Sequence, residues 1–493
     1  MNKQPIAENG WQHKPGDRII HLQRLPGRHL QRTLGVLGLF GAGYGDVGSS
    51  IYYGLGLVAM VALGATPIVL AIAGIIYILN ALTYAEGGAM ISEAGGSASF
   101  ARRAFNDFFG FASGWALLLS YIVVMAISAY SIPPYLSLFW PILSEPMIGT
   151  GVSMGIITFL MIINIRGVRE STRLNLFFAG IDILTQIALV VAGVVFILIP
   201  HPEILFQHMF GAGNWPPAQN LIYGIAIAAI CFTGLETVSQ LVEETRLPSK
   251  RIPRAYLLLI VVVLILFAGI SIVALSSMTP QVLGDPLQGW ARNPVAGIAD
   301  NFPIESFRTV FAPLVSILAT SILLVATNAG LLGISRLSFN LSKYKLFPAP
   351  LSRIHPRFKT PHITIITFSL IAMILLVPGL VSLDSFFTNL GGLFVFGSLL
   401  CFACAHLSIL ALRIREPDLA RPFKLGWNIL IKGKEIPLTV LIGLLSTFSI
   451  WIIVIITHQY SRWAGIAWMI LGLLIFAGFR FKSRIPIIHI KKS

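Results

Sequence analysis

The stretch GAGYGDVGSS, residues 41–50, interrupts an apolar run at 34–62 that otherwise has the composition of a membrane-spanning helix. It contains four glycines, two serines and one aspartate, Asp46. An ionised side chain at the centre of a bilayer costs roughly 2.5 kcal/mol or more, and glycine weakens a helix interior. Irregular backbone persists at this depth only where it lines a cavity or is buried in protein. The stretch therefore predicts a polar site inside a bundle of membrane helices.

The composition of the whole chain supports a membrane protein. Hydrophobic residues make up 56% of the 493 residues, charged residues make up 11%, and the mean hydropathy is +0.82. Long apolar runs recur along the sequence, and in hydrocarbon they must be helical because the backbone has to satisfy its own hydrogen bonds. The short alternating segments of a transmembrane β-barrel are not seen in the sequence. We expect an all-α polytopic membrane protein.

Twelve apolar runs are predicted to span the membrane. They lie at residues 34–62, 67–92, 109–139, 148–165, 174–199, 219–242, 255–278, 309–335, 362–379, 385–412, 436–457 and 463–479. The predicted organisation is therefore an N-terminal tail, 1–33, a transporter domain, 34–479, and a C-terminal tail, 480–493. No apolar segment precedes the first span, so the N-terminal tail has no features of a signal peptide.

The basic residues predict the orientation of these spans. An even number of spans puts both termini on one side, and all but three of the 35 Lys and Arg residues lie in the tails and loops of that side. The exceptions are Arg292, Arg308 and Arg462. By the positive-inside rule both termini are cytoplasmic and the chain lies in the cell membrane. The net charge of +15 then reflects topology, and we expect no nucleic-acid partner.

A second interruption, CFTGLE at 231–236, lies in the sixth span, which begins a second set of five. Matched interruptions in corresponding spans indicate a transporter with its site at the interface of two inverted repeats. Half-helix ends and freed backbone groups can bind ions there. Two ordinary glycine kinks at packing contacts are the alternative. The carboxylate in each segment, Asp46 and Glu236, favours transport.

Acidic residues inside the spans indicate the chemistry of the site. Asp46, Asp182 and Glu236 fall within predicted spans, and no Lys or Arg falls within one to pair with them. Unpaired acids at this depth either bind a cation or carry a proton, so we expect coupling to centre on these three. For Glu86 and Glu93, near the inner end of the second span, we expect hydrogen bonds to backbone instead.

Other polar residues within the spans have simpler interpretations. His406 is expected to be a hydrogen-bonded packing residue. Cys401 and Cys404 form a C-x-x-C without a second Cys or His pair, so packing is favoured over metal binding. The sequence contains no metal-ligand cluster or nucleophile–base pair at a recognisable spacing. We expect no metal, no cofactor and no catalytic residues, and a membrane enzyme or sensor is the least favoured class.

Asp46 has two polar neighbours if the first span stays helical through its motif. Asp46, Ser50 and Tyr53 then follow at i, i+4 and i+7 and share one face. A carboxylate, a hydroxyl and a phenol would be directed toward the same cavity. Tyr52 and Tyr53 are either lids over a small site or packing residues.

The chain resembles permeases of the amino acid–polyamine–organocation superfamily along nearly its whole length. Five segments carry the resemblance in family order: YAEGGAMISEAGGSASFARRAF (84–105), NIRGVRESTRLN (164–175), FTGLETVSQLVEETRLPSKRIPRA (232–255), NAGLLGISRLSFNLSKYKLFPAPLSRIHPRFKTP (328–361) and CAHLSILALRIREPDLARPFK (404–424). The resemblance implies a LeuT-type fold, with five plus five inverted helices and two more. It also implies secondary transport of a small solute without ATP.

By this resemblance, the substrate meets the interrupted parts of helices one and six. The family's first-helix pattern, Gly-Ser/Thr-Gly-Ile-Phe, falls on 48–52, whose amides would receive a substrate carboxylate. The residues expected to frame the substrate are Gly45, Gly48, Ser49, Ser50, Tyr53, Phe232, Thr233, Gly234 and Asn328. Proton or cation coupling is assigned to Asp46, Glu236 and Asp182.

Two departures and a second resemblance leave the substrate open. Ser50 replaces the last glycine of the family pattern, and Asp182 stands where many members carry a lysine that replaces a bound sodium ion. YGDVGSSIYY, 44–53, also resembles the first-helix signature of bacterial potassium-uptake permeases. The candidates are a neutral amino acid with a proton, a cationic amine, or potassium with a proton. We expect first a proton-coupled amino acid or amine permease in the lipid bilayer, with potassium uptake as the alternative.

Overall fold

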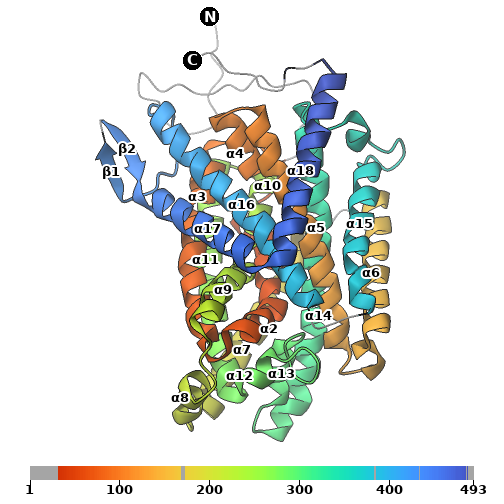
Figure 1. The fold of residues 1–493 in the computed structure, drawn as a ribbon, viewed down its shortest axis with the longest axis vertical. Helices are drawn as coiled ribbons and strands as arrows, with labels where there is room; N and C mark the ends of the chain where they lie inside the picture. The colour runs from red at the N-terminus through yellow and green to blue at the C-terminus, as the bar shows by residue number, and fades with distance from the viewer. Residues whose placement is uncertain (1–31, 168–171, 382–384, 432, 485, 487–493) are drawn as a thin grey trace, which may run out of the picture.

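The computed structural model describes residues 32–167, 172–381, 385–431, 433–484 and 486. Over these residues the chain is a bundle of long helices with one small two-stranded sheet (Figure 1). The all-α polytopic class is confirmed. Most of the predicted tails, 1–33 and 480–493, lie outside the described residues.

The long helices overlap the predicted apolar runs. They are α1 (Val36–Val47), α2 (Ile51–Ala62), α3 (Thr66–Met90), α5 (Asp107–Leu136), α6 (Pro146–Arg166), α7 (Thr172–Gly193), α9 (Ala218–Ala228), α11 (Pro248–Ser277), α14 (Glu305–Lys343), α15 (His362–Leu376), α16 (Phe386–Arg415), α17 (Leu438–Thr457) and α18 (Gln459–Lys482). Shorter helices complete the bundle: α4 (Ser97–Ala104), α8 (Pro202–Phe210), α10 (Glu236–Gln240), α12 (Pro280–Gly284) and α13 (Pro294–Asp300).

Eleven helical stretches among the described residues are long and apolar enough to cross a membrane. The first, Val36–Met90, has 55 residues, which at 1.5 Å per residue exceeds twice the roughly 30 Å of a hydrocarbon core. A 3₁₀ turn at Leu63–Ala65 divides it, and Leu63 has a positive φ of 46°. This stretch therefore contains enough helix for the two crossings predicted at 34–62 and 67–92. The total of twelve stays a prediction.

The centre of the bundle is α5, which runs between α14 and α16 in Figure 1. The most apolar 18-residue window of α5 is entirely buried, whereas 22% of the corresponding window of α18 is buried. In Figure 1, α6 and α15 pack together at the right-hand edge. A helix that is apolar around its circumference fits either a core or a membrane. Burial therefore distinguishes the central helix from those whose apolar side chains face outward.

The small sheet was not predicted. Strands β1 (Asn428–Ile431) and β2 (Lys434–Pro437) pair antiparallel between α16 and α17. Their two-residue turn includes Gly433 with φ of 75°, a conformation that glycine adopts without strain. The signal in the sequence was the glycine between two short β-prone runs, which are too short to span a bilayer.

Glu86 and Glu93 are held by arginines, so the expectation of mainly backbone partners is wrong. Arg413 donates through Nε to Glu86 Oε1 at 2.8 Å and through Nη2 to Oε2 at 2.7 Å. The Leu425 N–H adds one backbone bond to Glu86 at 2.9 Å. Arg102 pairs with Glu93 at 2.6 Å. The burial of Arg413 was not predicted, because the predicted span ended at residue 412. Helix α16 continues to Arg415 and places Arg413 in the protein interior.

The interpretation of His406 as a hydrogen-bonded packing residue is confirmed. Its Nδ1 lies 2.9 Å from the Thr83 hydroxyl, and its Nε2 lies 2.8 Å from Asn80 Oδ1. Both ring nitrogens are therefore satisfied inside the interface between α3 and α16.

Candidate functional site

The sixth predicted span loses its helical backbone over a few residues. Helix α9 ends at Ala228, a 3₁₀ turn covers Ala229–Phe232, and Thr233 is extended. Gly234 then adopts φ of +99°, and α10 begins at Glu236. Residues with a side chain rarely take this φ, so glycine is what permits the interruption.

The first predicted span is interrupted far less than expected. Helix α1 continues through Val47, a 3₁₀ turn covers Gly48–Ser50, and α2 follows without leaving the right-handed region. The Gly48 N–H still bonds the Tyr44 carbonyl, so the expected opening across 41–50 is wrong for this conformation. The hydroxyls of Ser49 and Ser50 donate to the Asp46 carbonyl, at 2.7 and 3.5 Å. Irregularity is confined to a turn with weaker hydrogen-bond geometry than an α-helix.

Two glycines of the motif serve helix packing. A Cβ on Gly43 would lie 2.7 Å from Val238 Cγ2, and one on Gly45 would lie 2.9 Å from Val325 Cγ1. Both distances are shorter than van der Waals contact, so the glycines let α1 approach α10 and α14 closely. Gly45, predicted to frame the substrate, is placed against α14.

Asp46 meets the interruption of the sixth span directly. The Thr237 hydroxyl donates to Asp46 Oδ2 at 2.5 Å. A Cβ on Gly234 would lie 2.7 Å from Asp46 Cγ, so the glycine backbone rests against the carboxylate. Asp46 is 1% exposed, and its Oδ1 has no hydrogen-bond partner among the described residues. One carboxylate oxygen is thus satisfied and the other is left free.

Glu236 is the second carboxylate of the site and has the same asymmetry. The Gly234 N–H donates to Glu236 Oε2 at 3.1 Å, while Oε1 has no partner in the part of the chain that the structure describes. Glu236 is also 1% exposed. Both acids therefore lie against Gly234, each buried with one oxygen that no described residue satisfies. We call Asp46 and Glu236 the carboxylate pair.

Sequence reasoning missed three side chains at the carboxylate pair. Thr237 bonds Asp46 as described. The buried phenol of Tyr121 on α5 and the buried amide of Gln240 on α10 are further polar groups near the pair. Thr237 and Gln240 are three residues apart on α10, and polar residues at helical spacing in an apolar span were the available signal.

Asp182 is not part of the carboxylate pair. Its carboxylate receives hydrogen bonds from Tyr44, Tyr52 and Gln186, at 2.8, 2.5 and 2.7 Å. All of these side chains are buried. The structure therefore separates the three predicted coupling acids into a pair with free oxygens and one acid that is fully hydrogen-bonded.

The remaining predicted site residues are dispersed. The Tyr53 hydroxyl lies 3.0 Å from Ser50 Oγ, so the predicted shared face brings these two together. Asn328 accepts a hydrogen bond from Asn164 of α6 at 2.6 Å. The ring of Phe232 packs on Tyr77 and borders an apolar cavity of about 210 Å³ between α3 and α11. Thr233 donates to the Ile230 carbonyl at 2.8 Å and stays beside Gly234.

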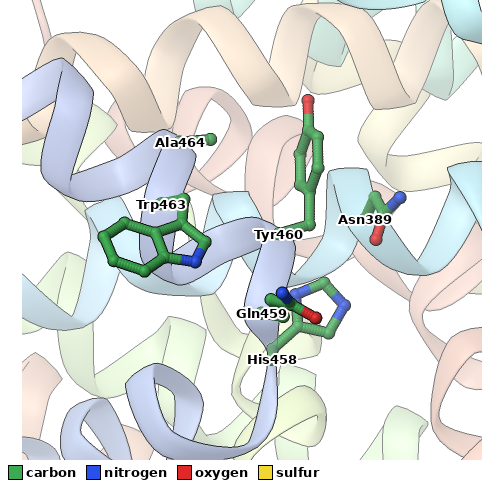
Figure 2. A pocket seen from close by; sticks show the side chains of 6 residues that line it. All are labelled: Asn389, His458, Gln459, Tyr460, Trp463 and Ala464. Atoms are coloured by element: carbon green, nitrogen blue, oxygen red, sulfur yellow. The ribbon is translucent and has the colours of Figure 1, made fainter.

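A larger pocket, of about 590 Å³, lies at the turn between α17 and α18 (Figure 2). Its lining residues are Asn389, His458, Gln459, Tyr460, Trp463 and Ala464. Burial lowers the pKa of His458, whose Nδ1 accepts from the Ser461 N–H at 3.2 Å and so caps α18. The lining contains no acid, so this pocket lacks the chemistry of the carboxylate pair.

Replacing Gly234 should damage the site. Gly234→Ala forces a side chain into a positive-φ conformation, at about 1–3 kcal/mol, and drives its Cβ into Asp46. We expect a lower unfolding temperature in detergent and loss of solute uptake by proteoliposomes. Gly180→Ala on α7 is the control, because a Cβ there meets nothing within 4 Å. Equal results for the two variants would contradict the role given to Gly234.

Comparison with known proteins gives one family for nearly the whole chain. A family model described as "Amino acid permease" matches residues 34–477. The branched-chain amino acid permease BcaP of Bacillus subtilis is 26% identical, over 91% of this chain and 93% of that protein. The methylthioribose transporter of Bacillus subtilis is 26% identical, over 80% and 84% respectively. The Asc-type amino acid transporter 1 of Mus musculus is 26% identical, over 72% and 64%.

Proposed function

Because the chain belongs to the amino acid permease family, and is thus a multi-pass membrane transporter and not an enzyme, we propose that it carries amino acids or related amines together with protons. Transport proceeds by alternating access across the cell membrane, with both termini in the cytoplasm. The observation that carries the proposal is the carboxylate pair, in which two buried acids each keep one free oxygen beside Gly234.

The need for a proton or cation follows from the surroundings of the pair. None of the salt bridges among the described residues involves Asp46 or Glu236. Two ionised carboxylates at bilayer depth are costly without positive charge. A substrate ammonium on one acid and a proton on the other would neutralise both, and releasing them on the far side would return the site to its starting state.

The two acids of the pair are better coupling candidates than Asp182. Asp182 already accepts three hydrogen bonds, so both of its oxygens have donors within the protein. Asp46 and Glu236 each have one oxygen with no donor among the described residues, where a ligand or a proton can bind. We therefore assign coupling first to Asp46 and Glu236 and keep Asp182 as the third candidate.

A substrate carboxylate would bind at the turn Gly48–Ser50 after a local opening. In the conformation described, the Gly48 N–H is engaged within the helix. The 3₁₀ turn is the part of this span with the weakest backbone bonds, so it is where N–H groups would be freed. Ser49, Ser50, Thr233 and Gly234 then frame the ligand from the two interrupted spans.

Uptake by proteoliposomes that contain the purified chain tests this function. With the lumen more alkaline than the medium, we expect accumulation of a labelled neutral amino acid or monoamine, and collapse of that accumulation by a protonophore. Rubidium, as a tracer for potassium, and a sodium gradient serve as comparison arms. Accumulation of rubidium without any amino acid or amine, or accumulation driven only by sodium, would contradict the proposal.

A further inference from the structure

Asp182 on α7 links the two sides of the turn in the first span. Tyr44, in α1, donates to its Oδ2 at 2.8 Å, and Tyr52, in α2, donates to its Oδ1 at 2.5 Å. Tyr44 precedes the turn Gly48–Ser50 and Tyr52 follows it. One carboxylate therefore holds the helix before the turn and the helix after it, through a separate oxygen for each.

The partners of Asp182 are themselves fixed. Gln186, one helical turn along α7, donates to Asp182 Oδ2 at 2.7 Å. Tyr135 of α5 donates to the Tyr52 carbonyl at 2.7 Å, and the two rings meet edge to face at 5.6 Å. Tyr52 is thus anchored through its hydroxyl and through its backbone. Two phenols, one on each oxygen of the same buried carboxyl group, therefore attach both α1 and α2 to α7.

Gly48 makes room for this arrangement. A Cβ at residue 48 would lie 2.6 Å from Cζ of Tyr44. The Tyr44 ring therefore lies directly over the turn, and its hydroxyl extends beyond the turn to Asp182. Glycine is therefore needed at position 48 whether or not a ligand binds there, because a side chain would displace the phenol of Tyr44.

We infer that Asp182, Tyr44 and Tyr52 form a clamp that holds the first span straight across the turn Gly48–Ser50, and that the clamp must open before substrate can bind. These are positioning residues, since they act through the turn and not on the substrate. The inference about binding rests on the proposed function, whereas the clamp itself is a statement about the protein alone. Both are tested with the full chain.

Hydrogen–deuterium exchange in lipid nanodiscs tests the clamp without substrate. In Tyr52→Phe we expect the amides of the segment around Gly48–Ser50 to exchange about tenfold faster, because Oδ1 of the buried Asp182 loses the donor that ties it to α2. Gly48→Ala should act in the same direction by displacing Tyr44. Tyr130→Phe is the matched control, since it removes a buried hydroxyl of α5 that has no hydrogen-bond partner among the described residues. Unchanged exchange in Tyr52→Phe, or an equal rise in the control, would overturn the clamp.

Uptake kinetics test whether the clamp opposes binding. If the straight helix is the state that cannot bind, the apparent affinity of the wild type is reduced by the small fraction of open molecules. Tyr52→Phe should then lower the KM for uptake, by up to about tenfold, without raising the maximal rate. An unchanged or raised KM would overturn the binding role. If the wild type transports no solute, the proposed function fails, and the exchange measurement still decides the clamp.

Discussion

Asp46→Asn is expected to lower amino acid or amine uptake driven by a pH gradient by at least about 30-fold. The substitution keeps the size of the side chain and removes the charge on which the proposed substrate ammonium depends. Losing one partner of a buried charged pair typically costs about 2–5 kcal/mol, and the lower end of this range corresponds to a rate about 30-fold lower. Initial uptake rates in proteoliposomes, normalised to the amount of reconstituted protein, measure the effect.

A second aspartate provides the control for this prediction. Asp300, at the end of α13, is exposed, so Asp300→Asn makes the same chemical change outside the bundle. We expect it to transport like the wild type. Accumulation by Asp46→Asn at the wild-type level would show that the carboxylate pair is not the site of coupling.

Glu86→Gln is expected to destabilise the fold by about 3–5 kcal/mol, because the buried Arg413 loses its closest carboxylate and keeps only the longer contact with Glu435, at 3.5 Å. Glu86 and Arg413 have side chains that are 0% and 2% exposed, and they form two hydrogen bonds. The pair joins α3 to α16, so its loss should loosen the packing between two long helices. Unfolding in detergent, followed by intrinsic fluorescence or differential scanning, measures the change.

A more exposed ion pair provides the comparison for Glu86. Arg103 and Glu416 pair at 2.6 Å, with side chains 21% and 35% exposed. Pairs of this kind contribute about 0–1 kcal/mol, so Glu416→Gln should scarcely change the unfolding temperature. If the two glutamine variants were equally stable, the buried pair would contribute no more to the stability of the fold than the exposed pair does.

The class of the fold and the position of the carboxylate pair could be predicted because both rest on the cost of charge in a bilayer. That cost draws attention to Asp46, Asp182 and Glu236 in the sequence, and the glycine near Glu236 does interrupt its helix. The pairing of Glu86 with Arg413 could not be predicted, because hydropathy does not fix a helix end to within one turn. A single turn decided whether this arginine lay in a loop or in the core.

The glycines of the first span were the least predictable part of the site. The same four glycines are compatible with an opened helix and with a straight helix in close contact with its neighbours. Only the neighbouring side chains distinguish these cases, as Val238 does for Gly43 and Tyr44 does for Gly48. The separation of Asp182 from the pair could not be predicted either, since it depends on tyrosine side chains from α1 and α2.

Simultaneous recording of proton entry and solute uptake tests the central claim most directly. Proteoliposomes that contain the wild-type chain and a pH-sensitive dye in the lumen would receive a labelled amino acid or amine without an imposed pH gradient. We predict acidification of the lumen in step with uptake, and loss of that acidification in Glu236→Gln. Uptake by the wild type with no change in lumenal pH would contradict proton coupling at the carboxylate pair.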